Sequence, residues 1–233
     1  MAQLAMNPPS PATSRTYGTW PNERMRTPIP ATGSLVGAHI IRGNYSPEIN
    51  FTLAPGQDFL APVRITANRP GAGGSVPVAW QGVPNARAFF MMAMGAMEDR
   101  TMILWTSSEA QFAGFGFLDY LAEDDVARLL QQRVLLPATT TQCTVPAEVA
   151  GRVQGASLML NAFGPEANFS YPARPARAPR GWAPDWTVKL RTRSAYMGML
   201  GQDLEAMMRG ETPERQQEQP RRRRSLRDRI LGQ

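Results

Sequence analysis

The sequence predicts an all-β fold, namely an antiparallel β-sandwich with one inserted short helix and disordered ends. Apolar and polar residues alternate with a period of two in several short segments, which is the pattern of strands with one solvent-exposed face. The 21 prolines and 20 glycines among 233 residues favour many short elements joined by turns. A hydrophobic share of 42% is sufficient for a core in a chain of this length.

Five segments carry the strand signal. Alternation at 63–66, 75–80 and 186–191 predicts strands of an antiparallel sheet. Residues 86–96 are apolar at nearly every position, which predicts a central strand covered on both faces, and 101–106 is its expected hairpin partner. The residues expected to be buried between the sheets are Val78, Trp80, Phe89, Met91, Phe169, Trp186 and Val188.

One helix is predicted at 123–134, inside the sheet region. Its apolar residues Val126, Leu129, Leu130 and Val134 recur at helical spacing, and acidic residues fill its first turn, where the helix dipole favours negative charge. Pro137 is expected to end it.

Three regions follow along the chain. Residues 1–33 contain six prolines among polar residues and predict a disordered arm. Residues 34–201 form the predicted β-sandwich domain, and 202–233 form a charged tail with a polybasic C-terminus. The formal net charge is +6, and six arginines against Asp228 place +5 of it in residues 221–233. No apolar run is long enough to span a bilayer, and no signal peptide is recognisable at the N-terminus of this chain.

An internal repeat relates 37–53 to 155–171 at a constant offset of 118 residues. Each copy contains Pro-Glu-x-Asn-Phe, at 47–51 and at 165–169, after an alternating run. The pattern predicts two equivalent β-hairpins. A shared ligand role for the Glu48/Asn50 and Glu166/Asn168 pairs is one interpretation, and turn capping by these side chains is the other.

Two resemblances add to this interpretation. The run 75–96 followed by 101–109, with Trp80 before Val83-Pro84-Asn85-Ala86, resembles the B, C and C′ strands of fibronectin type III-like domains and implies a sandwich of the fibronectin III or immunoglobulin type. Six further segments resemble a family of uncharacterised proteobacterial proteins without an assigned activity; they are WPN (20–22), LWTSSE (104–109), DYL (119–121), CTVP (143–146), GPEANFSYPARP (164–175) and PDWTVKLRTRS (184–194). Some members of that family have export-competent N-termini, which implies the periplasm or cell envelope, although this chain leaves the location open.

Residues with catalytic chemistry are few. His39 is the only histidine and Cys143 the only cysteine, so neither a zinc cage nor a disulfide is expected, and no phosphate-binding loop is present. Carboxylate pairs among Glu48, Glu109, Glu148 and Glu166 leave a hydrolase as the weakest alternative. No catalytic residue, cofactor or metal is therefore predicted, and no small-molecule substrate is implied.

The predicted function is that of a non-catalytic structural or binding module acting through protein–protein contacts, including contacts in a cell-envelope assembly. The expected partner is a protein, either a second copy or another chain. The alternative is an adaptor that binds an anionic surface, which would be an acidic protein, a lipid or a nucleic acid, through its tail. The tail residues predicted to make that contact are Arg221, Arg222, Arg223, Arg224, Leu226, Arg227, Arg229, Ile230 and Leu231.

Overall fold

The computed structural model describes residues 16–22, 24, 28–30, 32–44, 46–97, 99, 101–110, 119–153 and 155–202. The chain divides into two units, Met1–Gln202 and Asp203–Gln233, and every described residue belongs to the first. The predicted arm is therefore described only in part. Of the predicted tail, only Gln202 is described, so the residues predicted to bind a partner lie outside the described part of the chain.

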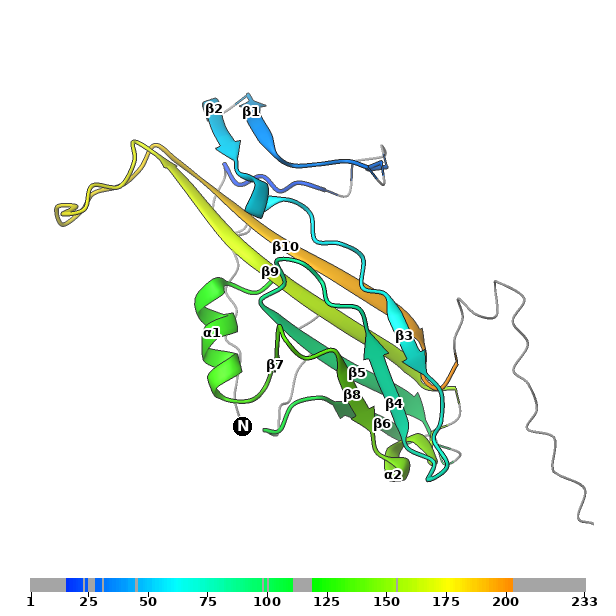
Figure 1. Ribbon diagram of the computed structural model, residues 1–233. Coiled ribbons are helices and arrows are strands. Elements are labelled where there is room, and N and C mark those ends of the chain that lie inside the picture. The colour runs from blue at the N-terminus through cyan, green and yellow to red at the C-terminus, as the bar shows by residue number, and fades with distance from the viewer. Residues whose placement is uncertain are drawn as a thin grey trace, which may run out of the picture. The chain divides into compact units, whose positions relative to one another are not determined.

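The described chain is mainly β, and its sheets are antiparallel (Figure 1). The strands are β1 (Gly37–Gly43), β2 (Ser46–Leu53), β3 (Ile65–Asn68), β4 (Val76–Trp80), β5 (Ala88–Ala96), β6 (Met102–Thr106), β7 (Leu136–Pro137), β8 (Gln142–Val145), β9 (Ser157–Tyr171) and β10 (Trp186–Met199). The helices are the 3-10 helix η1 (Pro55–Gln57), α1 (Glu123–Gln131) and a short α2 (Ala147–Ala150) that the sequence did not predict.

The strands form three sheets. The main sheet has the order β10-β9-β5-β6, with β7 pairing an end of β5. A second sheet has the order β3-β4-β8, and β1 and β2 form a separate hairpin. The ladder between β5 and β9 ends where Ala88 faces Phe163, so β9 beyond Phe163 pairs only with β10 among the described strands. The far end of the β9–β10 hairpin thus projects past the rest of the main sheet (Figure 1).

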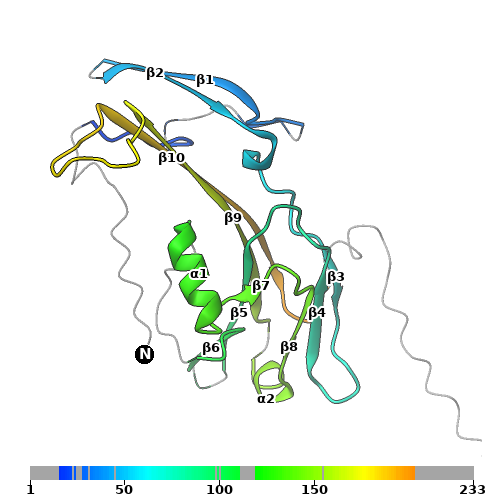
Figure 2. The same ribbon diagram turned by 60° about the vertical axis from the view of Figure 1, so that its left-hand side comes forward.

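The main sheet is the middle layer of the structure. On one face, Phe89 and Met91 of β5 pack in one cluster with Val78 and Trp80 of the second sheet. On the other face, Phe90 packs in a cluster with apolar residues of α1 (Figure 2). Neighbouring residues of a strand point to opposite faces, and both faces are covered here. All of these β5 side chains are therefore at most 2% exposed. The prediction of a central strand covered on both faces is confirmed.

The end of α1 differs from the prediction. The helix begins at Glu123 as expected but ends at Gln131, before Pro137, which lies in β7. Arg133 adopts a left-handed backbone with φ of 55°. The Arg133 and Val134 amides donate to the Leu130 and Leu129 carbonyls, which are the two hydrogen bonds of a Schellman cap. The backbone cap therefore stops the helix, and the proline does not.

The prediction of two equivalent hairpins is wrong for the second copy. Residues 37–53 form the hairpin β1–β2, which reverses at Asn44. The positions equivalent to Arg42 and Asn44 are Leu160 and Ala162, both 0% exposed in the core, so 157–171 continues as one strand. Gly164 and Pro165, the expected turn, form a bulge opposite Thr192.

Three residues expected in the core lie outside it. Phe169, Trp186 and Val188 are only half-buried, whereas Val78, Trp80, Phe89 and Met91 are buried as predicted. The reason is the projection of the β9–β10 end (Figure 1), and none of the three residues belongs to the cluster between the main and second sheets. The β1–β2 hairpin contacts this end, where the Phe51 and Phe169 ring centroids lie 5.0 Å apart.

Candidate binding groove

The two copies of Pro-Glu-x-Asn-Phe meet at the projecting end of β9 and β10. Phe51 of β2 contacts Phe169 of β9. His39, the residue of β1 that pairs with Phe51, stacks on the Phe51 ring with centroids 5.3 Å apart. The His39 Nε2–H donates to the Leu35 carbonyl oxygen at 2.6 Å. The repeat thus brings its two phenylalanines together, although only one copy is a hairpin.

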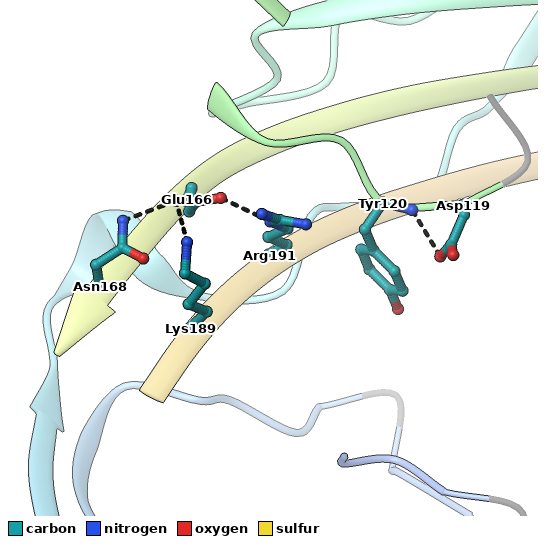
Figure 3. A network of polar contacts seen from close by, with 6 residues as sticks. All are labelled: Asp119, Tyr120, Glu166, Asn168, Lys189 and Arg191. Atoms are coloured by element: carbon teal, nitrogen blue, oxygen red, sulfur yellow. Dashed lines mark hydrogen bonds and ion pairs between the residues drawn. The ribbon is translucent and has the colours of Figure 1, made fainter. Parts of the chain in front are cut away.

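Glu166 is the centre of a polar network on β9 and β10 (Figure 3). Its Oε2 accepts a hydrogen bond from Arg191 Nε at 2.6 Å, and its Oε1 accepts one from Asn168 Nδ2 at 2.7 Å. Lys189 Nζ lies 3.8 Å from Oε1. Since the Glu166 side chain is only 8% exposed, its charge is satisfied by these three neighbours and very little by water.

The same network sets the protonation of Glu166. Burial raises the pKa of this carboxyl, but the hydrogen bonds from Asn168 and Arg191, together with the positive charges of Arg191 and Lys189, outweigh burial. The net result is a pKa below the ordinary value of 4.5. Glu166 is therefore a stable anion at neutral pH, which suits a structural acceptor better than a general acid.

The first copy of the motif repeats this arrangement at the surface. Glu48 accepts hydrogen bonds from Arg42 Nε at 2.8 Å and from Asn50 Nδ2 at 3.3 Å. Its side chain is 46% exposed, and that of Arg42 is 73% exposed. In both copies a glutamate thus links the asparagine two residues later to an arginine of the paired strand. Among the described residues, both glutamates bond an asparagine and an arginine of the strands, and the expected turn capping is not found there.

A groove lies beside these two motifs, between β2 and the end of β9–β10. Its volume is about 820 Å³, and it is open to solvent. Five of its lining residues are aromatic: Phe51, Phe169, Tyr171, Trp182 and Trp186. Tyr171 and Trp186 face each other across β9 and β10, and their rings stack with centroids 6.1 Å apart. Tyr171 nevertheless stays 59% exposed.

The charged residues that line the groove are Arg174 and Lys189, and both are cationic. The Arg174 guanidinium carbon lies 5.7 Å from the centroid of the Trp182 ring, a cation–π distance that joins two parts of the loop 172–185. Asn50 and Asn168, the motif asparagines, also line the groove. In the register of β9 and β10, Lys189 pairs with Asn168 and Trp186 pairs with Tyr171, three positions apart, so the Lys189 and Asn168 side chains lie on the opposite face of the hairpin from these two rings.

The other residues considered for chemistry lie apart from this groove or hold structural partners. Glu109 pairs with Arg133 at 3.1 Å, and Glu148 lies in α2. Cys143 is on β8, where burial raises the pKa of its thiol. Within the described ranges, no group of three or more His, Cys, Asp or Glu side chains is placed to hold a metal ion.

Sequence reasoning missed Tyr171, Arg174, Trp182 and Trp186 as a site. The signal was present in YPARPARAPRGWAPDW (171–186), where arginines and prolines separate three aromatic residues. That this segment and β2 line one groove depends on tertiary packing, which residue patterns do not reveal.

Comparison with known proteins gives no assignment. No family model matches the chain, and no curated protein matches it. Among the described helices, none combines the length and apolar character needed to cross a bilayer.

Proposed function

We propose that this protein is a non-catalytic binding module and that the aromatic groove is its binding surface. The observation that carries this function is the grouping of five aromatic residues and two cations around one open groove of about 820 Å³. Exposed aromatic side chains are enriched where proteins bind partners, because they supply large contact areas at low conformational cost.

The carboxylates of the chain give a hydrolase little support. Glu48, Glu109 and Glu166 each pair with a different arginine, on different elements. A pair of carboxyl groups acting on one bond would instead need one member with a raised pKa, and the pKa of Glu166 is lowered.

A fibronectin type III-like sandwich is the fold we propose for residues 34–201. The segments that resemble its B, C and C′ strands are β4, β5 and β6. β4 belongs to the second sheet, whereas β5 and β6 are neighbours in the main sheet, and the order β10-β9-β5-β6 corresponds to G-F-C-C′. In that scheme α1 is an insertion after C′. Such folds host many functions, so the groove and not the fold supports binding.

The choice of partner depends on charge. A protein partner, including one in a cell-envelope assembly, agrees with the proposed sandwich and with the exposed ring of Tyr171. An anionic partner agrees with Arg174 and Lys189, the two charged residues of the groove lining. The tail residues 221–231 are one proposed site for an anionic partner, and the groove is a second.

Site-specific crosslinking tests this function. A photoreactive amino acid at Thr187, an exposed groove residue, is compared with the same amino acid at Thr66, an exposed residue of β3. Illumination in cells that express the protein should give a discrete adduct from position 187 only. Identical adducts from both positions, or none from 187, would contradict the proposed binding surface.

A further inference from the structure

The aromatic groove offers ring faces and positive charge side by side. Tyr171 is the most exposed of its rings, and it stands next to Trp186 with only 18° between the two ring planes. Trp182 lies under Arg174 on the adjoining loop. Solvent-facing rings in parallel stacks are surfaces on which other planar groups stack.

The electrostatics of the same region favour an anionic ligand. Besides Arg174 and Lys189, the loop 172–185 carries the exposed Arg177 and Arg180, and Asp185 is its one acidic residue. Lys189 lies on the face of the hairpin opposite Tyr171 and Trp186, where it belongs to the Glu166 network. The positive charge beside the rings therefore comes from the arginines of the loop.

We propose that the aromatic groove binds a single-stranded polynucleotide. Its bases would stack on Tyr171 and on the neighbouring tryptophans, and its phosphates would contact Arg174 and the other arginines of the loop 172–185. Rings and cations along one groove are the combination used by proteins that bind single strands. A duplex conceals its base faces, a flat bilayer does not fit a concave surface, and an acidic peptide has no need of stacking rings. This inference rests on the proposed function of the groove as a binding surface.

The test uses the full chain and a fluorescein-labelled deoxythymidine oligomer of about 12 nucleotides, followed by fluorescence anisotropy at about 50 mM salt. Tyr171→Leu removes the exposed ring, and Tyr171→Phe keeps it. Arg174→Gln and Arg177→Gln remove groove charges on the loop 172–185, and Arg64→Gln removes an exposed charge beside β3 as the matched control. Thermal unfolding of each variant confirms that it folds.

The expected result is binding by the wild type that weakens at least about fivefold in Tyr171→Leu, with Tyr171→Phe close to the wild type. Each groove charge variant should weaken binding and flatten its salt dependence, and Arg64→Gln should do neither. A uridine oligomer distinguishes RNA from DNA as the source, and the matching duplex should bind more weakly.

Two outcomes overturn the inference. The first is that the oligomer does not bind. The second is that the oligomer binds the wild type and all groove variants equally, which would assign its binding to another basic part of the chain. A labelled polyglutamate peptide distinguishes failure of the polynucleotide inference from failure of the proposed function. If the wild type binds the peptide and the groove variants do not, the groove is a binding surface for acidic protein and not for polynucleotide. If neither probe binds and the Thr187 crosslink is absent, the proposed function fails as well.

Discussion

Replacement of Glu166 by glutamine tests whether its polar network stabilises the projecting hairpin end. The substitution keeps the shape of the side chain but removes its charge. Hydrogen bonds to charged groups contribute about 1.5–3 kcal/mol each, and part of that gain offsets the desolvation of a side chain that is 8% exposed. We therefore expect Glu166→Gln to lower the free energy of unfolding by about 1–3 kcal/mol at neutral pH.

The internal repeat supplies a matched control. Glu48→Gln makes the same chemical change in the same Glu–Asn–Arg arrangement, but there the carboxylate is 46% exposed and its arginine 73% exposed. Exposed pairs of this kind contribute about 0–1 kcal/mol. Urea unfolding of both variants beside the wild type should thus show a clear loss for Glu166→Gln and a small one for Glu48→Gln.

The pH dependence of the difference gives a second measurement. The pKa of Glu166 in the folded protein lies below 4.5, so its charge stabilises the fold fully above the pKa of the unfolded chain, and this stabilisation is lost as the pH falls through the folded-state pKa. The gap between the wild type and Glu166→Gln should be constant above about pH 5.5 and shrink below 4.5. Equal losses in both glutamine variants, or a gap that does not change with pH, would refute this reasoning.

Three further substitutions probe other parts of the fold by urea unfolding. Trp80→Ala should cost about 3–5 kcal/mol, because Trp80 is 2% exposed between the two sheets, and a cost below about 1 kcal/mol would place it outside the core. Arg133→Gly should stabilise by about 0.5–1 kcal/mol, since glycine adopts the φ of 55° without strain and the lost Glu109 pair is exposed; a net loss would contradict that account of the cap. Asn68→Ala should cost about 2 kcal/mol or more, because the buried amide donates to the Met199 and Gln202 carbonyls and accepts from the Gly201 amide; unchanged stability would show that these bonds are dispensable.

Patterns within one element were enough to predict several parts of the fold. The unbroken apolar run of β5 indicated a strand covered on both faces, and the spacing of Val126 and Leu129 with the acidic first turn indicated α1. These features depend on which residues are apolar and at what period, and the chain carries that information locally.

Features that depend on pairing between distant segments were not predictable in this way. The second Pro-Glu-x-Asn-Phe copy has the local signals of a turn, yet Leu160 and Ala162 just before it are core residues, and their burial holds the chain in an extended strand. The groove likewise arises because β9 and β10 continue past the end of β5 and meet β2. Residue patterns contain no measure of where a neighbouring strand stops.

The projecting hairpin end has to be stabilised without a core on both faces. Cross-strand side-chain pairs contribute only about 0.2–1 kcal/mol each, so several must act together. Tyr171 with Trp186, Arg191 with Glu166 and the contact of Phe51 with Phe169 meet that requirement in a segment where rings stay accessible. Tyr171, Trp186, Phe51 and Phe169 also line the groove, and Glu166 holds Asn168 and Lys189 of its lining in place. It follows that Glu166→Gln should weaken ligand binding at the groove by more than its loss of global stability explains. An equally destabilising change in the core between the sheets should leave ligand binding by the folded protein unchanged.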